Sequence, residues 1–228
     1  MCWNKEVSGL SFIFISLVSF LFYKRNLDND RLLAFFILSY GGMQLFEFFI
    51  WTGIDYSITS LNIFGSFLAA ILLYFHPLAI TLGMKQDNAY KQHVKTKFYK
   101  RCLIAASILF GLGVLYTLYH LLFKKTRTFI AFKDKLSGHL VWDFPQHYGI
   151  VLIIMIITAT LIWKQNKPFS LLFLGYFLIP LVIIRYTFKY AAKDKHLMAR
   201  GSYWCWYVAI FSIALYIANP YLQNNKKK

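Results

Sequence analysis

Apolar runs separated by short polar segments recur along the whole chain. A helix needs about 20 mostly apolar residues to cross the hydrocarbon core of a bilayer. Several stretches meet or approach that length, and the fifth of them is the shortest. We therefore predict seven transmembrane helices, at about residues 7–23, 32–52, 61–84, 102–123, 148–163, 169–188 and 203–221.

The segments between these runs are too short to hold a soluble domain, and the longest of them is 124–147. The pattern therefore predicts an all-α, multi-pass integral membrane protein that forms one bundle, with residues 124–147 as a loop over its outer end. Lys5 and Glu6 precede the first run, Lys24 and Arg25 follow it, and no Ala-x-Ala cleavage site comes after it. We expect this run to stay as a helix rather than be removed as a signal peptide.

Composition supports a membrane protein. The chain is 58% hydrophobic and only 15% charged, and its mean hydropathy is +0.50. Soluble domains usually carry about 25% charged residues. These values exclude a soluble enzyme, a disordered tail and a small secreted module held together by disulfides.

The formal net charge of +16 comes from 25 Lys and Arg against 9 Asp and Glu. The basic residues lie in short loops, where they meet anionic lipid headgroups. No segment is long enough to form the basic face of a soluble domain, so we expect the lipid bilayer as partner and no nucleic acid. Loops 24–31, 85–101 and 164–168 and the C-terminus carry more Lys and Arg than the other side. This excess predicts an outside N-terminus and a cytoplasmic C-terminus, in a membrane that the sequence does not identify.

Two pairs of small residues are spaced for close helix packing. They are Gly65-x-x-x-Ala69 and Ser107-x-x-x-Gly111. Small side chains at this spacing let two helix backbones approach each other inside a membrane. We expect both pairs to lie at helix contacts.

The candidate chemistry is concentrated in the second predicted helix. Tyr40, Gln44, Glu47 and Trp51 are spaced by 4, 3 and 4 residues, which places them on one face of a helix. A charged side chain at the centre of a bilayer costs about 2.5–3.5 kcal/mol or more. Glu47 is therefore expected to face the bundle and to have a partner. It could form a structural ion pair, bind a ligand, ion or proton, or be a solvated residue at the interface.

Depth in the membrane suggests the partner of Glu47. Arg185 and His120 lie near the outer ends of their helices, at a comparable level, and a guanidinium can hold a carboxylate with two hydrogen bonds. Arg185 is therefore our first choice. His76 lies about 22 Å from the outer end of its helix, too deep to contact Glu47. We accordingly predict no metal site.

Cysteine and lysine positions bear on other kinds of site. Cys2 and Cys205 are expected on the outer face, where they could form a disulfide or remain two free thiols. Cys102 is expected on the opposite side. The run 203–221 contains no lysine, which excludes a retinal Schiff base there. No other cofactor is indicated.

The order of several motifs resembles a family of seven-helix membrane proteins of unknown function. The motifs are Met1-Cys2-Trp3-Asn4, Gln44-x-x-Glu47 with Trp51, Pro77, Gly138-His139-Leu140-Val141-Trp142-x-x-Pro145, Arg185-Tyr186-Thr187 and Trp204-Cys205. The resemblance spans nearly the whole chain. It implies the seven-helix fold and brings no activity. It also implies that the loop with His139 and Trp142 packs over Cys2, Trp3 and Cys205.

The functional prediction is a protein that binds, transports or senses a small ligand, ion or proton through an outward-facing polar cavity. Its candidate residues are Tyr40, Gln44, Glu47, Trp51, His76, His120, His139, Trp142 and Arg185. One alternative is a membrane enzyme that acts on lipid or thiols at the outer face. The chain has no Gly-rich phosphate loop, no His-Glu-x-x-His and no Gly-x-Ser-x-Gly, which favours a non-enzymatic protein. A second alternative is a structural or host-interaction protein without a site. The oligomeric state is not indicated.

Overall fold

The computed structural model describes residues 4–123, 129–133, 140–141 and 203–224. This part of the chain is largely helical. Its helices are α1 (Lys5–Arg25), α2 (Asp30–Asp55), α3 (Thr59–Gln86), α4 (Lys97–Phe123) and α7 (Tyr203–Asn224). Two 3-10 turns, η1 (Asn88–Tyr90) and η2 (His93–Lys95), connect α3 to α4. The strands β1 (Phe132–Lys133) and β2 (Leu140–Val141) form a short antiparallel hairpin that the sequence pattern did not predict.

Within these ranges, the four helices α1 to α4 are long and apolar enough to cross a membrane. The predicted spans 7–23, 32–52, 61–84 and 102–123 lie inside them, and 203–221 lies inside α7. The spans 148–163 and 169–188 lie outside the described residues. Nearly every helix end reaches beyond the apolar run, because polar residues continue the helix outside the hydrocarbon. At the start of α1, for example, the Asn4 side chain accepts a hydrogen bond from the Val7 N–H at 2.9 Å.

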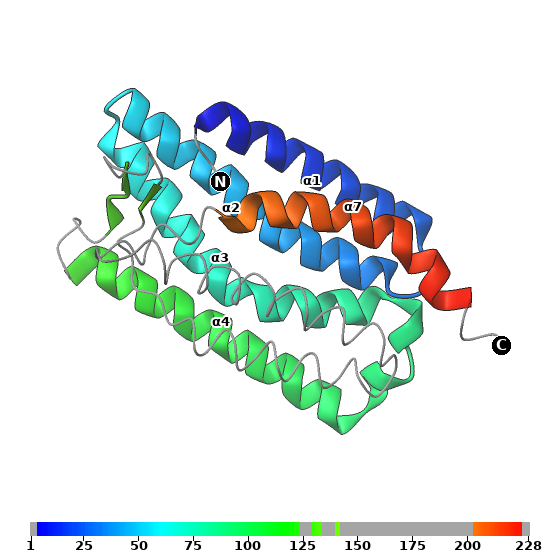
Figure 1. Cartoon of the computed structure of the whole chain (residues 1–228). Helices are drawn as coiled ribbons and strands as arrows, with labels where there is room; N and C mark the ends of the chain where they lie inside the picture. The colour runs from blue at the N-terminus through cyan, green and yellow to red at the C-terminus, as the bar shows by residue number, and fades with distance from the viewer. Residues whose placement is uncertain (1–3, 124–128, 134–139, 142–202, 225–228) are drawn as a thin grey trace, which may run out of the picture.

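Consecutive helices α1 to α4 run antiparallel, and α7 runs in the same direction as α1 (Figure 1). Helix α2 contacts α1, α3 and α7, whereas α4 packs on α3. The hairpin and the turn between α2 and α3 lie at one end, which we call the hairpin end. The α1–α2 connection, η1, η2 and the last turn of α7 lie at the other, which we call the loop end.

Glycine at position 65 lets α2 and α3 pack closely, as the small-residue spacing predicted. A Cβ atom there would lie only 2.8 Å from the carbonyl oxygen of Phe46 and 2.8 Å from a side-chain carbon of Ile50. The prediction for the second pair was wrong for the described helices. No described atom lies within 4 Å of a Cβ placed on Gly111, and Ser107 is exposed and bonds to Leu103 of its own helix.

Two apolar clusters form the core. One, towards the loop end, includes Phe22, Leu32, Phe36, Ile80 and Tyr90. The other, at the hairpin end, includes Ile50, Trp51, Ala69, Phe129 and Leu140. Between and beside these clusters lie the buried polar side chains that make up the candidate site.

Candidate functional site

The polar face predicted for the second helix points into the protein. On α2, the Glu47 side chain is fully buried, Trp51 is 1% exposed, Gln44 is buried and Tyr40 is half-buried. The reason is the central place of α2, which has neighbours on three sides. At 1.5 Å per residue these four side chains extend over about 16 Å of the helix. We call them, together with His76 of α3, the polar row.

His76 joins the polar row through Tyr40. The two rings stack with their centroids 4.0 Å apart and their planes 17° apart. His76 is 1% exposed, and its Nδ1 atom is buried without a hydrogen-bond partner in the described part of the chain. Tyr40 lies seven residues from Glu47, or about 10 Å along α2. The row therefore has a deep end at His76 and another end near the hairpin.

Trp51 forms the end of the row near the hairpin. Its indole belongs to the same apolar cluster as Phe129 and Leu140, and the Lys133 Nζ atom lies 5.9 Å from its ring centroid. The indole Nε1 atom is buried and has no hydrogen-bond partner among the residues that the structure describes. At each end of the polar row there is thus a buried polar atom that no residue of the described ranges satisfies.

Asn62 of α3 holds the hairpin segment over this end. Its side-chain Nδ2 donates to the carbonyl oxygen of Ala131 at 2.7 Å, and its Oδ1 accepts from the Ala131 N–H at 3.0 Å. The Asn62 amide therefore takes the place of a neighbouring strand. Sequence analysis did not single out Asn62, although an asparagine inside an apolar run is a signal that could have done so.

The remaining predicted site residues are placed only in part. His120 is buried on α4, with its ring centroid 4.4 Å from that of Tyr116. Cys102 is a half-buried free thiol. His139, Trp142, Arg185 and Cys2 lie outside the described residues, as does the side chain of Cys205. The Glu47–Arg185 pair and the Cys2–Cys205 disulfide therefore stay predictions.

Across residues 4–123, 129–133, 140–141 and 203–224, no group of three or more His, Cys, Asp or Glu side chains is arranged to hold a metal ion.

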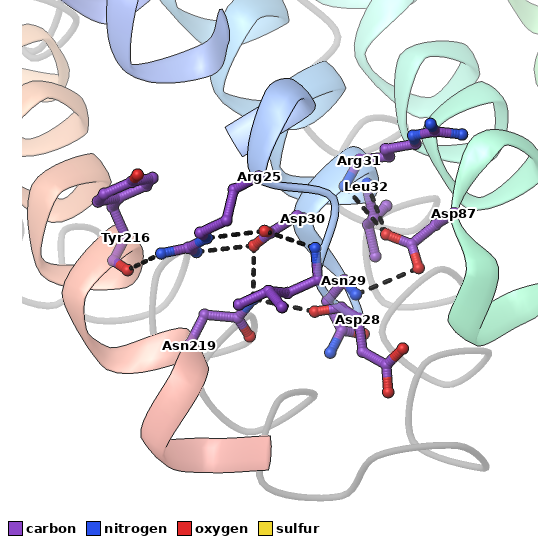
Figure 2. Close-up of polar contacts among 10 residues, drawn as sticks. Arg25, Asp28, Asn29, Asp30, Arg31, Leu32, Asp87, Tyr216 and Asn219 are labelled. Carbon is purple, nitrogen blue, oxygen red and sulfur yellow. Dashed lines mark hydrogen bonds and ion pairs between the residues drawn. The ribbon is translucent and has the colours of Figure 1, made fainter. Parts of the chain in front are cut away.

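A second buried polar group, which sequence analysis missed, lies at the loop end and centres on Asp30 (Figure 2). Both carboxylate oxygens of this fully buried residue accept from the Arg25 guanidinium, at 2.7 and 2.8 Å. Asp30 also accepts from Asn219 Nδ2 at 2.7 Å, and Arg25 donates to the carbonyl oxygen of Tyr216 at 2.6 Å. This group ties together the end of α1, the start of α2 and the last turns of α7.

Asp87, just after α3, forms the other half of that group. Its carboxylate accepts from the backbone N–H groups of Asn29, Arg31, Leu32 and Ala89 at 2.9–3.2 Å. Burial raises the pKa of the Asp87 carboxyl, although these four donors act in the opposite direction. Tyr90 donates from its hydroxyl to Asn29 Oδ1 at 2.7 Å. Burial first, and then the nearby carboxylates of Asp87 and Asp28, raise the pKa of Tyr90 well above its usual value.

The two buried polar groups differ in what they can do. At the loop end, guanidinium, amide and backbone donors hold the carboxylates of Asp30 and Asp87, which is the arrangement of a structural network. Two buried atoms there, Asn219 Oδ1 and Arg31 Nε, have no hydrogen-bond partner among the described residues. The polar row places a carboxyl and an imidazole group inside an apolar bundle, next to buried polar atoms that no described residue satisfies. We therefore take the polar row as the candidate functional site.

The described fold defines a class, a largely helical protein with at least four helices able to cross a membrane. No protein-family model, no curated protein and no solved structure matches the chain. The resemblance to a seven-helix family accordingly stays a prediction.

Proposed function

We propose that this chain is a seven-helix membrane protein that binds a small ligand, ion or proton along the polar row. The observation that carries the proposal is the pair of unsatisfied atoms, His76 Nδ1 and Trp51 Nε1, one at each end of the row. Buried polar groups are nearly always hydrogen-bonded, and an unsatisfied one costs about 1–3 kcal/mol. A bound molecule or water at each atom would remove that cost.

The chemistry of the row favours the proton among these candidates. Glu47 and His76 are the carboxyl and imidazole groups of the row, both can carry a proton, and both are buried. Gln44 lies between them along the row and can donate and accept hydrogen bonds. Chains of buried carboxyl and imidazole groups are typical of proton pathways within membranes.

The ends of the described segments support seven crossings. Asn219, near the end of α7, bonds to Asp30 at the loop end, and α7 begins 16 residues earlier at Tyr203, about 24 Å away along the helix. That start lies towards the hairpin end, where β2 also lies. Since β2 and the start of α7 lie at one end of the described helices, we propose an even number of crossings between them. The apolar runs 148–163 and 169–188 supply two.

The charges at the two ends support an outside N-terminus. Among the described residues, the loop end carries nine Lys and Arg against three Asp, whereas the hairpin end carries two basic and two acidic residues. Basic residues concentrate on the cytoplasmic side of membrane proteins. We therefore propose that the loop end faces the cytoplasm and that the Trp51 end of the polar row lies on the outer side.

Proton uptake into liposomes tests the proposed function. The full-length protein is reconstituted with a trapped pH-sensitive dye, and uptake is followed after a potassium diffusion potential is imposed. We expect uptake by the wild type and at least a tenfold loss in E47Q and in H76Q. The variant H93Q, at a histidine in η2 far from the row, is the matched control and keeps the wild-type rate. Equal rates for the wild type, E47Q and H76Q would contradict the proposal.

A further inference from the structure

The loop end presents a dense basic surface. We define it by its exposed basic side chains, which are Lys24, Lys85, Lys91, Lys95, Lys97, Lys100 and Arg101. Within the part of the chain that the structure describes, none of these seven forms an ion pair. Asp30 and Asp87 are nearby in the fold, but both are buried and bonded inside the loop-end network. The charge of the basic surface is therefore left without an acidic counterpart from Asp30 or Asp87.

The basic surface sits where α3 and α4 emerge from their apolar spans. Lys85 is in the last turn of α3, and Lys97, Lys100 and Arg101 are in the first turns of α4. Phe98 lies among them and is also exposed. A ring next to several basic side chains at the end of a span is the pattern of a residue at the boundary between headgroups and acyl chains.

The face of α4 below the basic residues is apolar. From Arg101, steps of three and four residues lead along exposed side chains, which are Ile104, Ile108, Leu112 and Leu115. These share one face of the helix with Lys97 and Arg101. This arrangement is complementary to a phospholipid. The acyl chains can lie along the exposed apolar face of α4, and the headgroup can contact the basic side chains at the start of the helix.

Clustering basic side chains at the start of α4 does not stabilise this helix. The first turn of α4 contains no acidic residue. Basic side chains there lie at the positive end of the helix dipole, where they are unfavourable. Seven like charges on adjoining segments also repel one another. Bound anions would remove both costs.

We propose that the basic surface binds the anionic headgroups of the phospholipid leaflet at the loop end, with Lys97, Lys100 and Arg101 as the main contacts. Complementary charge selects the headgroups, and the adjoining apolar face selects a membrane lipid over a free anion. This inference goes beyond the proposed function and does not depend on the polar row.

Lipid titration of the purified full-length protein tests the proposal. The protein is held in a neutral detergent, and its thermal unfolding is followed while phosphatidylglycerol, phosphatidylcholine or inorganic phosphate is added. We expect stabilisation by phosphatidylglycerol that weakens at high salt. Phosphatidylcholine and phosphate are expected to give little. Equal stabilisation by phosphatidylcholine, or full stabilisation by phosphate alone, would overturn the proposal.

A charge-matched pair of variants locates the site. K97Q/K100Q/R101Q removes three charges from the proposed contacts, and K226Q/K227Q/K228Q removes three from the C-terminus. Each basic residue near an anionic surface contributes about fivefold to binding. We therefore expect K97Q/K100Q/R101Q to need at least tenfold more phosphatidylglycerol than the wild type for half-maximal stabilisation. The increase for K226Q/K227Q/K228Q should be less than half as large. An equal shift in both would contradict a site at α4. Should the triple variant not fold, K100Q alone against K227Q gives the same comparison.

Discussion

The carboxylate of Asp87, just after α3, accepts a hydrogen bond at 3.1 Å from the backbone N–H of Asn29, 58 positions earlier in the chain. Asn29 is the residue before α2, has a left-handed conformation (φ 67°) and provides no side-chain cap of its own. Asp87, which follows α3, caps α2 instead, because it also accepts hydrogen bonds from the backbone N–H groups of Arg31 and Leu32. One buried carboxylate thus fixes how the end of α3 meets the start of α2.

Replacing that carboxylate is expected to destabilise the loop end. In D87N, a single amide oxygen must serve four backbone donors, and its NH₂ group would face some of them. Because loss of a helix cap and burial of unsatisfied donors each cost about 1–2 kcal/mol, we expect a loss of about 2 kcal/mol in unfolding free energy. Denaturant unfolding in mixed micelles measures it. D28N, at an exposed aspartate, should stay within about 0.5 kcal/mol of the wild type. Wild-type stability for D87N would contradict the capping role.

The Arg25–Asp30 pair should behave as one unit. R25Q leaves the buried Asp30 carboxylate without its cation, and breaking a buried pair costs about 3 kcal/mol. The double variant R25Q/D30N should lose clearly less than the sum of the single losses, because it removes both charges together. A double-mutant cycle by the same unfolding assay measures the difference, with the neighbouring exposed K24Q as control. Strict additivity would show that the pair is not coupled.

Gly65 lies at a helix contact, whereas Gly111 lies at an open position of α4 among the described residues. In G65A, the added methyl group would lie 2.8 Å from the Phe46 carbonyl oxygen, so α2 and α3 must move apart. Overpacking of this kind costs about 1–3 kcal/mol. G111A meets no described atom within 4 Å, and alanine favours a helix by up to about 1 kcal/mol over glycine. We expect G65A to lower the thermal midpoint and G111A to leave it unchanged or raise it. The reverse order would contradict the α2–α3 packing.

Tyr90 is expected to make the free energy of unfolding fall as the pH rises above 10. Its pKa is raised in the folded protein, so above pH 10, its usual value, the folded state keeps a proton that the unfolded state loses. Stability from Tyr90 is therefore full below pH 10 and declines as pH rises above it. We expect Y90F to be less stable than the wild type by about 1 kcal/mol at pH 8, for loss of the bond to Asn29. That gap should shrink above pH 10. Y221F, at an exposed tyrosine, is the control and should show no such change.

Features that depend on neighbouring residues could be predicted from the sequence, whereas contacts between distant segments could not. The inward face of α2 followed from the spacing of Gln44, Glu47 and Trp51, because helix periodicity depends only on neighbouring residues. The stacking of Tyr40 on His76 and the Asn62–Ala131 bonds depend on how two segments are aligned, and no short pattern encodes that. Helix ends were predicted too short, because hydropathy marks the part of a helix in hydrocarbon and not its polar turns.

The acidic residues of the loop end were missed for a related reason. Asp30 and Asp87 lie in the predicted loops 24–31 and 85–101, of which only the Lys and Arg residues entered the prediction. Their burial results from contacts with Arg25, Asn219 and backbone amides that lie up to 189 positions away. An acidic residue next to the end of an apolar run, in an otherwise basic loop, is the sequence signal that could have identified them.

We expect the polar row to bind a molecule, ion or water that is not part of the protein. A density map of the full-length protein in a lipid nanodisc, at a resolution that shows side chains and bound water, tests it most directly. We predict density that no protein atom accounts for at each end of the row, one feature within about 3.2 Å of His76 Nδ1 and another within about 3.2 Å of Trp51 Nε1. A map in which apolar side chains alone surround these two atoms, with no additional density, would contradict the claim.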